Sequence, residues 1–168
     1  RLFPNSLIWY DISKFELNNI NAGSKPYSWS FEDFETLLQN TKEIADKGIS
    51  PWCANSESAY STGWIQTNWL EDILLTKYGP LVYDDWSKLK INASNIKIYL
   101  SIKQIEEFIF YENHINNGYG TIISKEFRNL PKVMLDDSID CFLSWSGHYF
   151  RYYIPDEYIY LEDYAVAP

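Results

Sequence analysis

Residues 50–64 read SPWCANSESAYSTGW, a stretch in which two tryptophans and a tyrosine stand among small polar residues. The stretch has no helical period and is therefore predicted to be a loop. Core aromatic residues are expected on helices and strands, so aromatics in a polar loop indicate a binding surface. A pyranose ring has apolar C–H faces and a polar rim, and a cleft that binds it needs flat apolar side chains beside polar ones.

The composition of the 168-residue chain fits one globular domain, residues 1–168, that can bury a sizeable core. A net charge of −9 argues against nucleic acid as a partner, because phosphate binding requires a basic surface. The same charge disfavours anionic membranes, and no apolar run is long enough to span a bilayer. The chain opens Arg1-Leu2-Phe3-Pro4, with neither an initiator methionine nor a signal peptide, from which we expect a mature fragment or an excised domain.

Hydrophobic periodicity predicts long helices and a few short strands, and hence a helix-rich α/β domain. The clearest helix is expected to begin at Ser30, which forms a capping-box pattern with Asp33, and to end before Gly48. Strands are predicted near 6–10, 140–144 and 158–164, further long helices at 65–77 and 93–113, and shorter helical segments at 11–15, 81–86, 124–128 and 146–152.

Cys53 and Cys141 are the two cysteines of the chain. Neither belongs to a C-x-x-C pair, and no metal-ligand spacing is present, so we expect neither a metal nor a cofactor. Two cysteines this far apart in sequence are compatible with one disulfide or with two buried thiols.

Several short motifs follow one another in a consistent order along the chain. They are Trp9-Tyr10, residues 29–34, Pro51-Trp52-Cys53, Glu57-Ser58, Thr62-Gly63-Trp64, and residues 68–75, 79–86, 131–137 and 141–143. In this order they resemble the extracellular solute-binding proteins of ABC-type carbohydrate importers, and most of all the branch that handles alpha-glucosides and related sugars.

The resemblance implies the C-terminal lobe of a two-lobe, periplasmic-binding-protein-like (type II) fold, with the N-terminal lobe missing from this chain. The strands near 6–10 and 158–164 would then be the crossings to that lobe. The implied partners are a small carbohydrate and the permease and ATPase of the importer, and the implied state is a monomer. The implied location is the periplasm or the extracellular face of the bacterial cytoplasmic membrane. Relatives carry both cysteines, which favours a Cys53–Cys141 disulfide between the 52 loop and the 142 strand.

Three tryptophans are candidates for stacking on the sugar. Trp64 stands at the entrance to a helix, where free backbone N–H groups can also meet hydroxyls. Trp145 follows a buried strand and precedes a helical segment, a place where ligands bind in open α/β sheets. Relatives carry longer polar or basic side chains at this position, so the sugar itself stays open. Trp52 would face the cleft if its neighbouring cysteine is buried. The alternative for each tryptophan is a packing role.

Two further residues complete the predicted ligand-binding set. The carboxylate of Glu57 suits charge-assisted hydrogen bonds from sugar hydroxyls, although a solvated loop residue or a helix cap is the alternative. Tyr10 ends the first strand and is expected to reach the cleft, with a buried packing role as its alternative.

These residues predict capture without chemistry, as the substrate-binding component of a sugar import system. A glycoside hydrolase fragment is the main alternative, and it would require two carboxyl groups that face each other across the scissile bond. Glu57 has no clear partner for that role, and no Ser/His/Asp or Cys/His set is evident, so we predict no catalytic residues. A protein-interaction module with aromatic hot spots is a third possibility.

Overall fold

The computed structural model describes residues 6–20, 30–57 and 63–167, and the statements below concern these ranges. The predicted residues 58–62 of the aromatic loop lie outside them. The described strands are β1 (Leu7–Asp11), β2 (Leu143–Ser146) and β3 (Tyr164–Ala167). The described helices are α1 (Ile12–Leu17), α2 (Phe31–Ala45), α3 (Trp64–Ile73), α4 (Pro80–Ser87), α5 (Ile96–Phe110), α6 (Tyr119–Ile122) and α7 (Leu130–Met134), with a π-helix η3 (Leu74–Tyr78) and 3-10 helices η4 (Phe127–Asn129) and η5 (His148–Tyr153).

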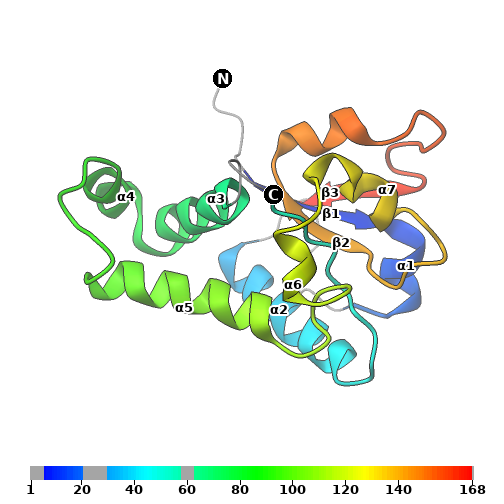
Figure 1. The fold of residues 1–168 in the computed structure, drawn as a ribbon, viewed down its shortest axis with the longest axis horizontal. Coiled ribbons are helices and arrows are strands. Elements are labelled where there is room, and N and C mark those ends of the chain that lie inside the picture. Colours follow the sequence, from blue (N-terminus) through cyan, green and yellow to red (C-terminus); the bar gives the residue numbers. More distant parts are fainter. Residues whose placement is uncertain (1–5, 21–29, 58–62, 168) are drawn as a thin grey trace.

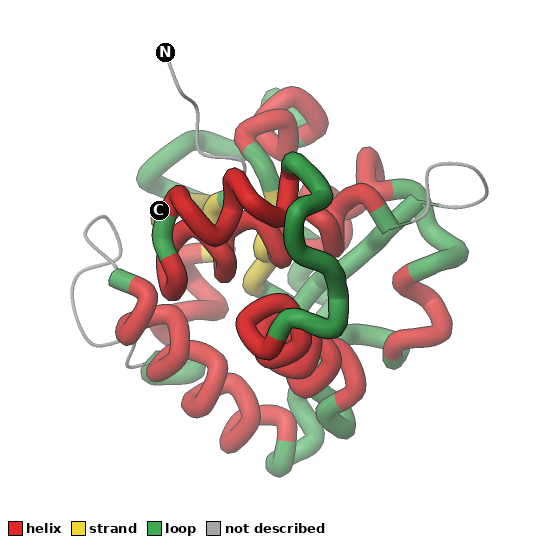
Figure 2. The backbone as a smooth tube through the Cα atoms, turned by 90° about the vertical axis from the view of Figure 1, so that its left-hand side faces the viewer, coloured by secondary structure: helices red, strands yellow, loops and turns green. Residues whose placement is uncertain are grey.

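The three described strands form one small antiparallel sheet in the order β2-β1-β3. In Figure 1, α3, α4 and α5 extend to one side of this sheet, while α1 and α7 lie on the other side. Figure 2 shows the short strands surrounded by helices. The prediction of a helix-rich α/β domain with few short strands is confirmed.

The sequence signals at the start of α2 are realised in the structure. The backbone N–H of Ser30 donates to Asp33 Oδ2 over 2.7 Å, and the N–H of Asp33 donates to the Ser30 hydroxyl over 3.3 Å. This capping box satisfies backbone donors that the first turn of a helix leaves unpaired. The buried residues of α2 recur at helical spacing, which seats this face of the helix on the core: Phe34, Leu37, Leu38, Thr41, Ile44 and Ala45.

The buried residues form two hydrophobic clusters. The first contains Trp52, Trp69, Phe108, Phe142 and Trp145. The second contains both cysteines with Trp9, Met134 and Phe150, among others. Successive residues of β1 alternate between the clusters, since Ile8 and Tyr10 belong to the first and Trp9 belongs to the second.

The predicted exit strand at 158–164 is wrong in its position, because β3 begins at Tyr164 and ends at Ala167. The preceding residues form turns, in which the N–H of Ile159 donates to Asp163 Oδ2 over 2.7 Å and Leu161 has a φ of 68°. Their loose alternation in the sequence does not correspond to a buried face, because Ile159, Tyr160 and Leu161 are exposed.

Other elements also begin or end at residues that differ from the predicted ones. The strand predicted at 140–144 begins at Leu143, the segment at 146–152 is a 3-10 helix, and the helix predicted at 65–77 passes into a π-helix at Leu74. The helix predicted at 93–113 begins only after Asn95, whose side chain accepts a hydrogen bond from the N–H of Lys97. Across the described ranges, no helix combines the length and apolarity needed to cross a membrane.

Candidate functional site

A disulfide joins Cys53 to Cys141, with 5.3 Å between the two Cα atoms, and confirms the pairing that the resemblance implied. Hydrogen bonds support the same junction. The N–H of Cys53 donates to the carbonyl of Leu143 over 2.7 Å, and the N–H of Phe142 donates to the carbonyl of Pro51 over 3.0 Å. The loop that carries Trp52 and Glu57 is therefore fixed beside the start of β2.

The strand register brings the two ends of the described chain to one edge of the sheet. Leu7, at the start of β1, pairs with Ser146, the last residue of β2, and Ile8 pairs with Ala167, the last residue of β3. We call this edge, defined by Leu7, Ser146 and Ala167, the chain-end edge. Helix α3 lies beside it (Figure 1), and the indole N–H of Trp69 ties the helix to it by donating to the carbonyl of Trp145 over 2.9 Å.

Trp64 is the first residue of α3 and is partly exposed. Its ring lies 5.0 Å from that of Tyr149 in η5 and 5.2 Å from that of Phe127 in η4, measured between centroids. Phe127 and Tyr149 are themselves 5.3 Å apart. We call these three rings the aromatic cluster. Gly63 allows the chain to enter the helix here, because its φ of 97° is one that residues with a side chain rarely adopt.

Glu57 is held close to the start of α3. The hydroxyl of Ser56 donates to Gln66 Oε1 over 2.6 Å and accepts from the N–H of Gly63 over 3.3 Å. Glu57 itself is partly buried and has a φ of 65°, a left-handed conformation that is uncommon for a residue other than glycine. The structure thus brings Glu57 and Trp64 to the same end of α3, and their role in ligand binding stays a prediction.

Trp52 does not face a cleft. Its side chain is fully buried, with its ring 5.0 Å from that of Phe108 and its indole N–H donating to Thr41 Oγ1 over 3.0 Å. Trp52 and Cys53 do point to opposite sides, as strand alternation predicted, but the side that Trp52 faces is the first hydrophobic cluster. We therefore correct its role from sugar stacking to core packing.

Trp145 and Tyr10 also lack a free face. Trp145 is only 7% exposed and stacks on Trp69, with 5.2 Å between ring centroids and 14° between ring planes. Tyr10 packs against Phe15 at 4.8 Å and pairs with Leu143, at the opposite end of β1 from the chain-end edge. Trp145 and Tyr10 are both core residues here, because both belong to the first hydrophobic cluster.

Tyr149 and Phe127 are the parts of the aromatic cluster that sequence reasoning missed. Tyr149 could have been found, since it follows the end of β2 by three residues and the argument applied to Trp145 holds equally for it. Phe127 carries no such signal, because only the tertiary fold brings η4 to α3. His148, also in η5, is exposed beside Tyr149.

Two titratable side chains near the chain-end edge have shifted pKa values. Burial raises the pKa of Asp72 to about 6, although a hydrogen bond from the Trp145 indole N–H, 3.3 Å from Asp72 Oδ2, opposes this shift. Burial also raises the pKa of Tyr149, whose hydroxyl is hydrogen-bonded to the side chains of Ser146 and Asn68. Polar side chains, those of Asp72, Asn68 and Ser146, therefore lie next to Tyr149 of the aromatic cluster.

A second polar network lies inside the first hydrophobic cluster. His114 is fully buried, with Nε2 2.8 Å from Thr41 Oγ1 and Nδ1 2.8 Å from the carbonyl of Phe108. Burial lowers the pKa of His114 to about 4, so this imidazole is neutral at physiological pH. Its position beneath Trp52 gives it a structural role.

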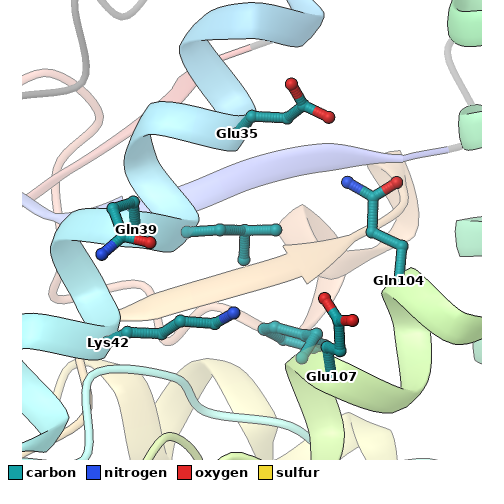
Figure 3. A pocket seen from close by; sticks show the side chains of 7 residues that line it. Glu35, Gln39, Lys42, Gln104 and Glu107 are labelled. Atoms are coloured by element: carbon teal, nitrogen blue, oxygen red, sulfur yellow. The ribbon is translucent and has the colours of Figure 1, made fainter.

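Figure 3 shows a groove between α2 and α5, with the side chains of Glu35, Gln39, Lys42, Gln104 and Glu107 around it. Leu38 and Phe108 also line this groove. The groove holds about 160 Å³, which is below the range typical of ligand pockets. The groove shares no residue with the aromatic cluster, and its two apolar lining residues, Leu38 and Phe108, are almost completely buried. We therefore place the candidate site at the chain-end edge and not in this groove.

Two curated proteins are similar to most of this chain, whereas no protein-family model matches it. The osmoprotective compounds-binding protein GgtB of Synechocystis is 27% identical over 92% of the chain and 35% of its own length. The alpha-glucosides-binding periplasmic protein AglE of Rhizobium meliloti is 27% identical over 94% of the chain and 33% of its own length. The chain is thus homologous to part of a solute-binding protein. It spans about a third of the length of these relatives.

Solved structures of sugar receptors share the fold. The bacterial solute receptor AcbH, described as exclusive for β-D-galactopyranose, aligns with a TM-score of 0.63 and 17% identity over 98% of the chain and 38% of its own. The maltose-bound MalE3 of T. maritima aligns with a TM-score of 0.59 and 13% identity over 97% and 37% of the two chains. The predicted resemblance to extracellular solute-binding proteins is confirmed, and one of the two curated relatives, AglE, is by its name a periplasmic protein.

Proposed function

We propose that this chain is the C-terminal lobe of a two-lobe receptor that captures a small carbohydrate or sugar-like solute for an ABC-type importer. The main supporting observation is that the aromatic cluster adjoins the chain-end edge, where the hydroxyl of Ser146 donates to the hydroxyl of Tyr149 over 3.3 Å. A partner lobe reached through the two chain crossings would face Trp64 and Tyr149 across a cleft. The names of the relatives, which bind osmoprotective compounds and alpha-glucosides, support this class of ligand.

Binding would use the aromatic cluster as a flat apolar wall and Glu57 as an acceptor for sugar hydroxyls. The two lobes would close about the hinge because the closed form makes contacts with the sugar that the open form lacks. The importer's permease and ATPase would then recognise the closed monomer. The disulfide supports a location in the periplasm or on the outer face of the cytoplasmic membrane, since such bonds persist in oxidising compartments.

The receptor and the glycoside hydrolase alternatives differ in whether the sugar is consumed. The homologues are binding proteins, which favours a receptor with no catalytic residues. Incubation of the full-length protein with a sugar that it binds, followed by chromatography of the sugar, should return that sugar unchanged. Turnover of a glucoside would contradict the receptor assignment.

Melting of the full-length natural protein tests the ligand class and the role of Trp64. Glucose, galactose, maltose, chitin oligosaccharides and sugar-like osmolytes form the panel. A ligand at about 100 times its Kd should stabilise the native state by about 2.7 kcal/mol. The W64A variant should lose this shift and keep an apo melting temperature near that of the wild type, because Trp64 is partly exposed.

The matched control is W69A, which removes a tryptophan of the same helix that is 2% exposed. Its apo melting temperature should fall steeply, since truncating a core tryptophan costs about 3–5 kcal/mol. A W64A protein that keeps the ligand-induced shift would show that Trp64 does not touch the sugar.

A further inference from the structure

Helix α3 presents a stripe of three residues along the chain-end edge. Trp64, Asn68 and Asp72 follow one another at four-residue spacing, which places them on one face of a helix. The adjacent face, with Ile65 and Trp69, is buried in the first hydrophobic cluster. Trp64 belongs to the aromatic cluster. Asn68 and Asp72 continue the stripe from Trp64 toward the C-terminal end of α3, away from the proposed binding face.

Asp72 joins three elements that meet at this edge. Its Oδ2 accepts the hydrogen bond from the indole N–H of Trp145 in β2. The hydroxyl of Ser6, the residue that precedes β1, lies beside the carboxyl group, and among the described residues this buried hydroxyl has no hydrogen bond of normal geometry. Asp72 therefore links α3 to β2 and lies beside Ser6, immediately before β1.

Asn68 connects the same helix to the aromatic cluster. Its side chain is hydrogen-bonded to the hydroxyl of Tyr149, whose ring packs on Trp64 at 5.0 Å. The position of α3 against the sheet thus decides how Trp64 and Tyr149 meet. A group that fixes this position preorganises the wall that a sugar would contact.

The ionised form of Asp72 destabilises the fold. None of the lysine, arginine or histidine residues described in the structure forms an ion pair with it, and the titratable groups that face it are Glu71 on α3 and Tyr149 on η5. Burial, aided by Glu71, raises the Asp72 pKa from 3.8 to about 6, so stability falls as pH rises between these two values. A carboxyl group with a perturbed pKa beside a cluster of aromatic rings is a candidate for a functional role.

We propose that Asp72 is a positioning residue that, when ionised, holds the Trp64 face of α3 against the chain-end edge and so makes sugar binding stronger at neutral pH than at acidic pH. The inference rests on the proposed function. Its physical basis is that a carboxylate accepts a stronger hydrogen bond from the Trp145 indole than a carboxylic acid does. Protonation loosens the link between α3 and β2, and the aromatic wall loses its preorganisation.

The test compares the full-length wild type with D72N, which keeps the size and one acceptor oxygen of the side chain. Whichever sugar of the panel gives the largest melting shift is titrated by calorimetry between about pH 5 and about pH 7.5. The wild type should bind about three- to tenfold more weakly at the acidic end, as expected for the loss of one charge-assisted hydrogen bond, with a midpoint near 6. D72N should bind with the weaker affinity at every pH and should melt higher than the wild type at neutral pH.

Glu71→Gln is the matched control, because it removes a neighbouring charge from the same helix but leaves the contact with Trp145. This variant should keep the pH dependence, with a slightly lower midpoint, since Glu71 contributes to the raised pKa of Asp72. In parallel, the indole N–H resonance of Trp145 should titrate near pH 6 in the wild type and stay fixed in D72N.

The outcomes separate the two proposals. If no member of the panel, sugar or sugar-like osmolyte, binds at any pH, the proposed function is wrong, and the Trp145 resonance still reports whether Asp72 ionises at this contact. If a sugar binds with an affinity that does not depend on pH, or if D72N keeps the wild-type profile, the positioning role of Asp72 is wrong and the receptor function stands.

Discussion

Removal of the Cys53–Cys141 disulfide is expected to cost a large share of the stability of this fold. The bridge closes a loop with a sequence separation of 88 residues, and the loss of chain entropy in the unfolded state then amounts to about 4–5 kcal/mol. Native domains are stable by about 5–15 kcal/mol in total. The Cys53→Ser/Cys141→Ser double variant should therefore show a clearly lower urea midpoint by tryptophan fluorescence, which reports on the indoles packed around both ends of the bridge.

The single variants C53S and C141S are the matched controls for this experiment. Each removes the same covalent bond, so both should lose nearly as much stability as the double variant. The backbone hydrogen bonds of Cys53 and Phe142 remain available in all three proteins, so the fold itself should persist. A difference below about 1 kcal/mol between oxidised wild type and double variant would refute the entropic reasoning.

Three further predictions concern local features of the fold. Thr41→Val should lower the free energy of unfolding by about 1–3 kcal/mol in urea, because His114 Nε2 and Trp52 Nε1 both lose their partner, whereas the exposed control Thr36→Val should change it by less than about 0.5 kcal/mol. The imidazole of His114 should titrate near pH 4 by NMR, and its burial in the neutral form should make stability fall as pH drops from 6.5 toward 4; a midpoint near 6.5 would contradict its burial. Ser30→Ala should reduce the melting temperature through the loss of about 0.5–2 kcal/mol of capping energy, and an unchanged value would show that the capping box is dispensable.

Local sequence signals predicted the elements whose causes lie within a few residues. Helix α2 was predicted correctly from the capping box of Ser30 and Asp33 and from the apolar period that follows it. Strand β1 was predicted from the apolar run near the start of the chain. Elements held by distant contacts were placed less well. Tyr158–Tyr164 alternates like a strand, but the pairing partner of β3 is β1, more than a hundred residues away, and the register starts only at Tyr164.

The candidate site shows the same difference between features that local sequence signals predict and features that depend on distant contacts. Trp64 and Glu57 could be proposed from the sequence because both stand in a polar loop at the entrance to a helix. Trp52 and Trp145 have equally suggestive neighbours, yet their rings are buried against Phe108 and Trp69 respectively. Burial depends on which segments pack together, and this information is not contained in the residues around a tryptophan.

The sequence by itself determined the class of the molecule: an acidic, aromatic-rich, helix-dominated α/β chain whose ordered motifs resemble solute-binding proteins. Only the tertiary structure decided which aromatic rings form an outer wall, because the antiparallel register brings Leu7, Ser146 and Ala167 to one edge and packs Phe127 and Tyr149 on Trp64. The physical reason is that helix caps and periodicity act over one or two turns, whereas the exposure of a side chain is set by contacts between segments far apart in the chain.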